Sequence, residues 1–149
     1  MSQRLDNNAA SPAGMKALGG VYGHLTQSGL PHSLINLVFL RVSLINGCAF
    51  CIDMHSRDLL KAGLSAEKLA LVPAWYEAGA LFTDQEKAAL RWSEALAKVA
   101  QTHIPDEEFE AARQYFSEKE LTDLTIAIGL INAYNLLGVG FRLTPAAAK

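Results

Sequence analysis

The chain has 149 residues, of which 50% are apolar and 19% are charged, and its formal net charge is −2. A chain of this length can bury a core as one domain, and its high apolar and low charged content excludes extensive disorder. The charged residues form no basic stripe, so no nucleic-acid-binding surface is expected. Two cysteines are too few for the disulfide framework of a small secreted protein.

Two segments bear on where the protein acts. Residues 1–20 lack the apolar run of a signal peptide, so we expect a cytoplasmic protein. Residues 124–141 carry no charge over a length close to that of a membrane span. Because this stretch also contains Asn132, Asn135 and three glycines, we expect a buried helix and no membrane contact.

Helical periodicity covers most of the first half of the chain, and the alternation typical of strands is absent. After a flexible tail over residues 1–13, the pattern predicts helices over 15–26, 34–45 and 48–62. Gly47 interrupts the chain between the last two helices, and Gly63 ends the third.

Helix start signals mark the second half of the chain. Ser65 caps a short helix that ends before Pro73, while residues 75–81 are compatible with helix or loop. Capping boxes at Thr83–Glu86 and Ser117–Glu120 open two longer helices, and a further helix begins at Pro105.

The last of these helices is predicted to run from 121 to about 141, followed by a flexible tail over 144–149. The connections between the helices are short, which favours antiparallel neighbours. The sequence therefore predicts an all-α fold of six to seven helices in a single domain over residues 14–143.

The most informative segment holds Cys48, Cys51 and His55, which share one face of a predicted helix. Both cysteines fall in its first turn, where free amides and the helix dipole stabilise a thiolate. A histidine one turn further on can accept the thiol proton. Cys-x-x-Cys spacing also allows a local disulfide, so this segment predicts a redox site.

Other interpretations of these residues stay open. Both cysteines can be ordinary core residues, because free cysteine buries readily. The three side chains can also be part of a zinc site, although zinc requires a fourth ligand and no second Cys pair exists. His55 can be a helix histidine unrelated to the thiols.

At these residues the chain resembles the alkylhydroperoxidase D-like branch of the carboxymuconolactone decarboxylase superfamily. The resemblance spans roughly residues 15–142 and is carried by Leu40-Arg41-Val42-Ser43, Ile45-Asn46-Gly47-Cys48-Ala49-Phe50-Cys51, Met54-His55, Lys61-Ala62-Gly63, Trp75, Leu81-Phe82-Thr83 with Glu86 and Ala88-Ala89-Leu90, Ile131-Asn132 with Asn135, and Phe141-Arg142.

This resemblance implies an all-helical thiol peroxidase without a cofactor or metal ion. It assigns attack on the hydroperoxide to Cys51, resolution as a disulfide to Cys48, and proton transfer to His55. It also implies an external thiol reductant and a homo-oligomer, either a trimer or a hexamer. The decarboxylase branch lacks the cysteine pair, so decarboxylation is not expected.

The chain departs from the family's peroxidases at two positions. Those enzymes carry a relay glutamate twelve residues before the first cysteine, where this chain has Asn36. They also carry a histidine between the cysteines, where this chain has Phe50. Because an amide cannot accept a proton, Asn36 predicts weaker activation of the thiol.

The remaining polar and aromatic residues receive structural interpretations. We expect Asp53 to be solvated or capping, Arg41 to pair with an internal acid, and Asn132 and Asn135 to bond between helices. Three large aromatic residues are expected in the core or at subunit contacts: Trp75, Phe82 and Trp92. Three histidines receive no role: His24, His32 and His103.

A hydroperoxide-reducing enzyme is therefore the leading hypothesis. The alternatives are an oxidant-sensing or structural oligomer with little turnover, and a metal-binding module.

Overall fold

The computed structural model describes residues 2–148, and this part of the chain contains helices and no strands. The α-helices are α1 (Asn7–Ala10), α2 (Pro12–Thr26), α3 (His32–Asn46), α4 (Ala49–Lys61), α5 (Ala66–Ala70), α6 (Asp84–Ala97), α7 (Val99–Thr102), α8 (Asp106–Arg113) and α9 (Glu118–Gly140). The 3-10 helices are η1 (Val72–Glu77), η2 (Gly79–Leu81) and η3 (Ala146–Ala148). The predicted all-α fold is confirmed.

The predicted cap residues begin the helices for the expected reason. The Thr83 hydroxyl accepts the Glu86 N–H, and the Glu86 carboxylate accepts the Thr83 N–H in return. Ser117 and Glu120 make the same reciprocal pair at the start of α9. These bonds satisfy amides that have no partner within the helix, so they fix the residues at which α6 and α9 begin.

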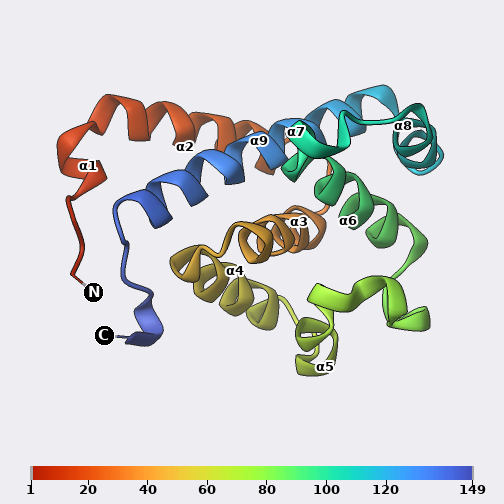
Figure 1. Ribbon diagram of the computed structural model, residues 1–149, viewed down its shortest axis with the longest axis horizontal. Helices are drawn as coiled ribbons and strands as arrows, with labels where there is room; N and C mark the ends of the chain where they lie inside the picture. Colours follow the sequence, from red (N-terminus) through yellow and green to blue (C-terminus); the bar gives the residue numbers. More distant parts are fainter. Residues whose placement is uncertain (1, 149) are drawn as a thin grey trace.

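Helix α3 is the centre of the fold, with α4, α6 and α9 packed around it (Figure 1). Its buried residues occupy most of its circumference: Leu34, Ile35, Leu37, Val38, Phe39, Leu40, Val42 and Ser43. One core cluster joins α3 to α2, α6 and α9, and a second joins it to α4, η1 and α6. Because α3 is buried on several sides, it provides a rigid support for α4, which packs against it.

Helix α9 is long and apolar enough, by length and composition alone, to cross a membrane. In the fold, its Leu124, Ala127 and Ile131 side chains are completely buried. The helix packs along α3 and also contacts α2, α4 and α6. Packing within the protein therefore accounts for the apolar residues on the inner face of α9.

The N-terminal segment differs from the predicted flexible tail over residues 1–13. Within it, α1 forms and α2 begins at Pro12. The Arg4 N–H donates to the Phe141 carbonyl oxygen at 2.9 Å, and the Asn7 side chain is buried. Contacts with the distant end of the chain order this segment, and such contacts leave no local sequence pattern.

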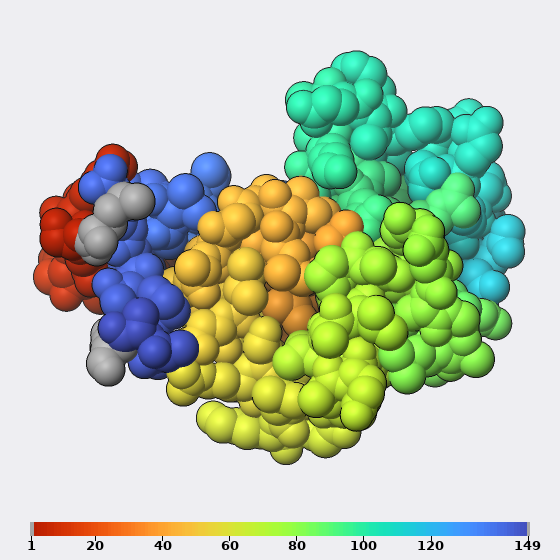
Figure 2. Space-filling view, turned by 60° about the horizontal axis from the view of Figure 1, so that its bottom comes forward, coloured from red at the N-terminus to blue at the C-terminus, as the bar shows by residue number. Residues whose placement is uncertain are grey.

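The C-terminal segment predicted as a tail over 144–149 is also held to the fold in its described part. The Ala147 N–H donates to a carboxylate oxygen of Asp53 at 3.2 Å, which joins η3 to α4. The N-terminal segment bonds to the end of α9 through Arg4 and Phe141, and both terminal segments lie at one end of the molecule (Figure 2).

Candidate functional site

The turn between α3 and α4 places both cysteines at the start of a helix. Gly47 ends α3 in the left-handed conformation, with φ 68° and ψ 32°, which favours glycine. Cys48 is the N-cap of α4, and its sulfur faces the Cys51 N–H at 3.4 Å. The predicted position of the thiols at the beginning of this helix is therefore observed.

Cys48 and Cys51 form a disulfide in the structure. Both residues are buried, with exposed fractions of 1% for Cys48 and 2% for Cys51. The bond spans three residues along the chain, so it closes within one helical turn. The Cys-x-x-Cys pair is thus close enough for local disulfide exchange without any movement of distant elements.

A cavity of about 530 Å³ opens beside this helix, and Cys51, His55 and Asn36 line it whereas Cys48 does not. The size is typical of sites that enclose an organic molecule. Its other lining residues come from the chain ends and from α2, α3, α4 and α9: Gln3, Asp6, Asn7, Asn8, Met15, Tyr22, Phe39, Phe50, Met54, Asp58, Tyr134, Leu137, Leu143 and Thr144.

His55 is buried at the cavity wall and is held by α3. Its Nδ1 lies 3.1 Å from the Asn36 Oδ1, and its ring lies 5.0 Å from the Phe39 ring. Because an amide oxygen only accepts, Nδ1 donates the hydrogen and Nε2 keeps its lone pair. Nε2 is buried and has no hydrogen-bond partner among the described residues.

The charge state of His55 follows from this burial. Removal from water lowers the pKa of His55 to about 4, and the negative charge of Asp58 opposes part of that shift. The ring is therefore neutral near pH 7. A neutral imidazole with an unused lone pair can accept a proton from a nearby thiol.

Cys48 lies on the other side of the disulfide, against α9. A Cβ atom placed on Gly138 would lie 2.6 Å from the Cys48 sulfur and 3.6 Å from the Cys51 sulfur. Only a residue without a side chain therefore fits at this point of α9. Sequence reasoning missed Gly138, because a glycine inside a helix gives no sign of what it faces.

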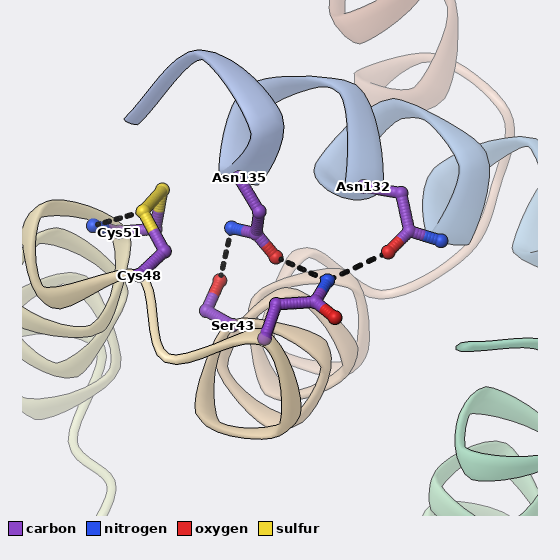
Figure 3. The surroundings of a disulfide bond; sticks show 6 residues. Ser43, Cys48, Cys51, Asn132 and Asn135 are labelled. Atoms are coloured by element: carbon purple, nitrogen blue, oxygen red, sulfur yellow. Dashed lines mark hydrogen bonds between the residues drawn. A yellow bond between two sulfur atoms is a disulfide. The ribbon is translucent and has the colours of Figure 1, made fainter. Parts of the chain in front are cut away.

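Hydrogen bonds between α3 and α9 hold the helices around the disulfide (Figure 3). The Asn135 amide donates to the Ser43 hydroxyl at 2.9 Å. The Asn46 amide donates to both Asn135 and Asn132, at 3.0 and 2.7 Å. The predicted helix-to-helix role of the two α9 asparagines is thus observed.

Arg41 has the predicted acidic partner, whereas Asp53, which was expected to be solvated or capping, forms an ion pair. Arg41 pairs with Glu94 at 2.8 Å, and the same carboxylate accepts the Trp75 indole N–H. Asp53 pairs with Arg57 on the exposed side of α4. All three aromatic residues expected in the core or at subunit contacts are buried: Trp75, Phe82 and Trp92.

Two of the three histidines without a predicted role have hydrogen-bond partners. His24 bonds to the buried carboxylate of Asp123, and His32 bonds to a backbone carbonyl. Within residues 2–148, no group of three or more His, Cys, Asp or Glu side chains could hold a metal ion.

The sequence matches the model of the carboxymuconolactone decarboxylase family over residues 12–95. The uncharacterized protein YdfG of Bacillus subtilis is 34% identical over 139 residues, which cover 93% of this chain and 94% of YdfG. The uncharacterized protein YnjA of Escherichia coli is 34% identical over 97 residues, or 65% of this chain and 52% of YnjA.

Solved structures extend this similarity to the whole fold. A protein of unknown function from Agrobacterium tumefaciens, provisionally described as an antioxidant defence protein of the AhpD type, has a TM-score of 0.92 and 42% identity, covering 97% of this chain and 98% of its own. An uncharacterized peroxidase-related protein from Ralstonia eutropha, described as an alkylhydroperoxidase AhpD core, shares the fold with a TM-score of 0.80 and 18% identity, over 93% and 73% of the two chains. The chain therefore belongs to the carboxymuconolactone decarboxylase family and has the AhpD-like all-α fold.

Proposed function

We propose that this protein is a thiol peroxidase in which Cys51 attacks a hydroperoxide, Cys48 resolves the product and His55 transfers protons. One observation carries the proposal: Cys51 and His55 line the same cavity, whereas Cys48 is bonded to Cys51 from outside that cavity. This asymmetry gives each sulfur a different access to a substrate.

The first step uses the reduced protein. His55 Nε2 accepts the Cys51 thiol proton, and the resulting thiolate attacks the terminal oxygen of the hydroperoxide. The O–O bond breaks, the alkoxide leaves with the proton from His55 as an alcohol, and Cys51 becomes a sulfenic acid. The substrate is reduced by two electrons, and the sulfur is oxidised by two.

The second step uses the sulfur behind the cavity. The Cys48 thiol attacks the Cys51 sulfenic acid, an S–S bond forms and water leaves. The product is the disulfide found in the structure. An external dithiol then donates two electrons and two protons to restore both thiols. This requirement fits the reducing cytoplasm as the place of action.

Cysteine variants test the assignment of roles. Cys51→Ser should abolish oxidation by cumene hydroperoxide, because the remaining thiol does not line the cavity. Cys48→Ser should accumulate a sulfenic acid on Cys51, which dimedone traps and mass spectrometry locates. If dimedone labels Cys48 in the first variant and nothing labels Cys51 in the second, the roles are reversed.

An oxidant sensor with slow turnover is a second candidate, and Asn36 favours it. The group that holds His55 is an amide and cannot take a proton onward, unlike a carboxylate at the same position. Peroxide consumption with excess dithiothreitol separates the two functions. Many turnovers per protein support an enzyme, while oxidation that stops after one equivalent supports a sensor.

A further inference from the structure

The fixed charges around the active-site cavity are negative. Among its described lining residues, Asp6 and Asp58 carry the formal charges, and neither lysine nor arginine is present. His55 is neutral near pH 7, because its pKa is lowered to about 4. The rest of the wall consists of apolar, aromatic and uncharged polar side chains.

The two aspartates are not equivalent. One carboxylate oxygen of Asp6 accepts the N–H groups of Asn8 and Ala9, at 2.9 and 3.2 Å. These amide donors offset part of the Asp6 charge. Asp6 therefore has a structural role at the start of α1, where it is the N-cap.

The charge of Asp58 has no such partner. No side chain or amide in residues 2–148 forms a hydrogen bond or ion pair with its carboxylate, which is half-buried. The adjacent Arg57 pairs with Asp53 at 2.9 Å, and Arg4 donates to the Gly140 carbonyl oxygen at 2.8 Å. Both arginines thus have partners other than Asp58.

Asp58 lies three residues after His55 on α4, so the two side chains are neighbours on one helix face. Asp58 and Cys51 line the same cavity, about two turns apart on α4, so a substrate bound at Cys51 shares the cavity with this carboxylate. In a cavity with apolar walls, the repulsion between like charges is much stronger than in water. The Cys51 thiolate adds a second negative charge in the reactive state.

We propose that Asp58 is a specificity-determining residue that restricts the cavity to hydroperoxides without a negative charge. This inference rests on the proposed peroxidase function and adds a substrate class to it. Apolar side chains such as Phe39, Phe50 and Leu137 would contact the organic part of a neutral hydroperoxide. A substrate carboxylate would find no cation among the described lining residues.

A matched pair of probes isolates the charge effect. Para-carboxycumene hydroperoxide and its methyl ester share the reacting group and differ in one negative charge remote from it. The fully reduced protein is mixed with each probe, quenched with a neutral maleimide, and the rate constant of disulfide formation is measured by mass spectrometry. The ratio of ester to acid cancels any general change in Cys51 reactivity.

The wild-type protein should oxidise at least tenfold faster with the ester than with the acid. Asp58→Asn should reduce this ratio at least threefold, even if loss of the charge also alters His55 and slows both reactions. Asp84→Asn is the matched control, because it removes one exposed charge from another helix and should leave the ratio unchanged. Equal rates with the two probes, or an unchanged ratio in Asp58→Asn, would overturn the proposal.

A separate measurement distinguishes this inference from the proposed function. Cys51 is alkylated with neutral iodoacetamide and with anionic iodoacetate in two proteins, the Cys48→Ser variant and the same variant that also carries Asp58→Asn. The ratio of the iodoacetate rate to the iodoacetamide rate is compared between them. If neither hydroperoxide oxidises the thiols, the peroxidase function fails. Asp58 still governs charge selection if its substitution raises the relative iodoacetate rate, and does not if that rate is unchanged.

Discussion

His55 depends on its surroundings for its neutral state, since the ring is 5% exposed and has one hydrogen-bond partner, Asn36. Burial lowers its pKa from 6.5 to about 4. Between these two values the unfolded chain binds a proton at this site and the folded chain does not. The folded state is therefore favoured above pH 6.5 and loses this advantage as the pH falls toward 4.

Acidification from pH 7.5 to pH 5 should thus lower the free energy of unfolding by about 2 kcal/mol through His55 alone. Denaturant unfolding of wild type and His55→Gln at both pH values measures this contribution as a difference. The other histidines contribute equally to both proteins and cancel. The same pH dependence in both proteins would show that His55 titrates normally in the fold.

Gly138 provides the second test at this scale. In Gly138→Ala the new methyl group would occupy the space of the Cys48 sulfur, so that sulfur must shift. We expect Cys51 to react with hydroperoxide as before but the disulfide to form at least tenfold more slowly. Dimedone trapping of the longer-lived Cys51 sulfenic acid measures this delay.

Gly129→Ala is its control on the same helix, because a Cβ there would meet no atom within 4 Å. Alanine is the better helix former, so this variant should fold at least as stably as wild type. A slow disulfide in Gly129→Ala as well would indicate a general effect on α9 and refute the role of Gly138.

The site was only partly predictable from single residues. Cys51 and His55 lie on α4 and Cys48 is its N-cap, so their spacing alone indicated a common face. Gly138 comes from a distant helix, and no local pattern shows which residues it meets. Asp58 gave no signal either, because a charged residue on a helix usually faces water.

At the scale of elements, the bonds between α3 and α9 determine where the cysteines lie relative to the helix behind them. Asn135 is 2% exposed and satisfies both Ser43 and Asn46. The last turn of α3 is thereby joined to α9 immediately before the turn that carries Cys48. Buried amides of this kind stabilise one arrangement of two apolar helices over others.

Asn135→Ala should therefore cost about 2–3 kcal/mol of stability, because it leaves buried polar partners unsatisfied. Asn132→Ala should cost less than half as much, since Asn132 is half-buried. The Asn46 amide would also keep Asn135 as an acceptor after Asn132 is removed. Urea unfolding at pH 7.5 compares the two variants. Equal losses would contradict the central place of Asn135 in this network.

The elements themselves were largely predictable because their start signals are local. The capping boxes and Ser65 satisfy free amides within their own first turn, and Gly47 ends α3 through its own backbone conformation. The segment over 75–81 was undecided and forms 3-10 turns around Trp75, whose indole bonds to Glu94 on α6. Tertiary contacts thus decide what local preference leaves open.

At the scale of the whole molecule, α9 carries apolar side chains on both its inner and its outer face. Leu136 is 76% exposed, and Val139 and Ile126 are 50% and 38% exposed. Other apolar side chains are exposed elsewhere, including Tyr76. Exposed apolar residues along one helix are typical of surfaces that another subunit covers.

We accordingly propose a homo-oligomer larger than a dimer, a trimer or a hexamer, and expect Leu136→Asp to dissociate it. Sedimentation velocity over a dilution series measures the state of both proteins. Thr122→Asp, exposed on the same helix, is the control and should leave assembly intact. A stable, fully active monomer at micromolar wild-type concentration would refute the proposal.

The meeting of the two chain ends has a practical consequence for anyone who studies this protein. Gln3 and Asp6 from one end and Leu143 and Thr144 from the other line the cavity that holds Cys51. An affinity tag or fusion partner joined at either end would thus be linked to a segment that lines this cavity. Tagged preparations should be compared with cleaved ones before any rate is attributed to the protein itself.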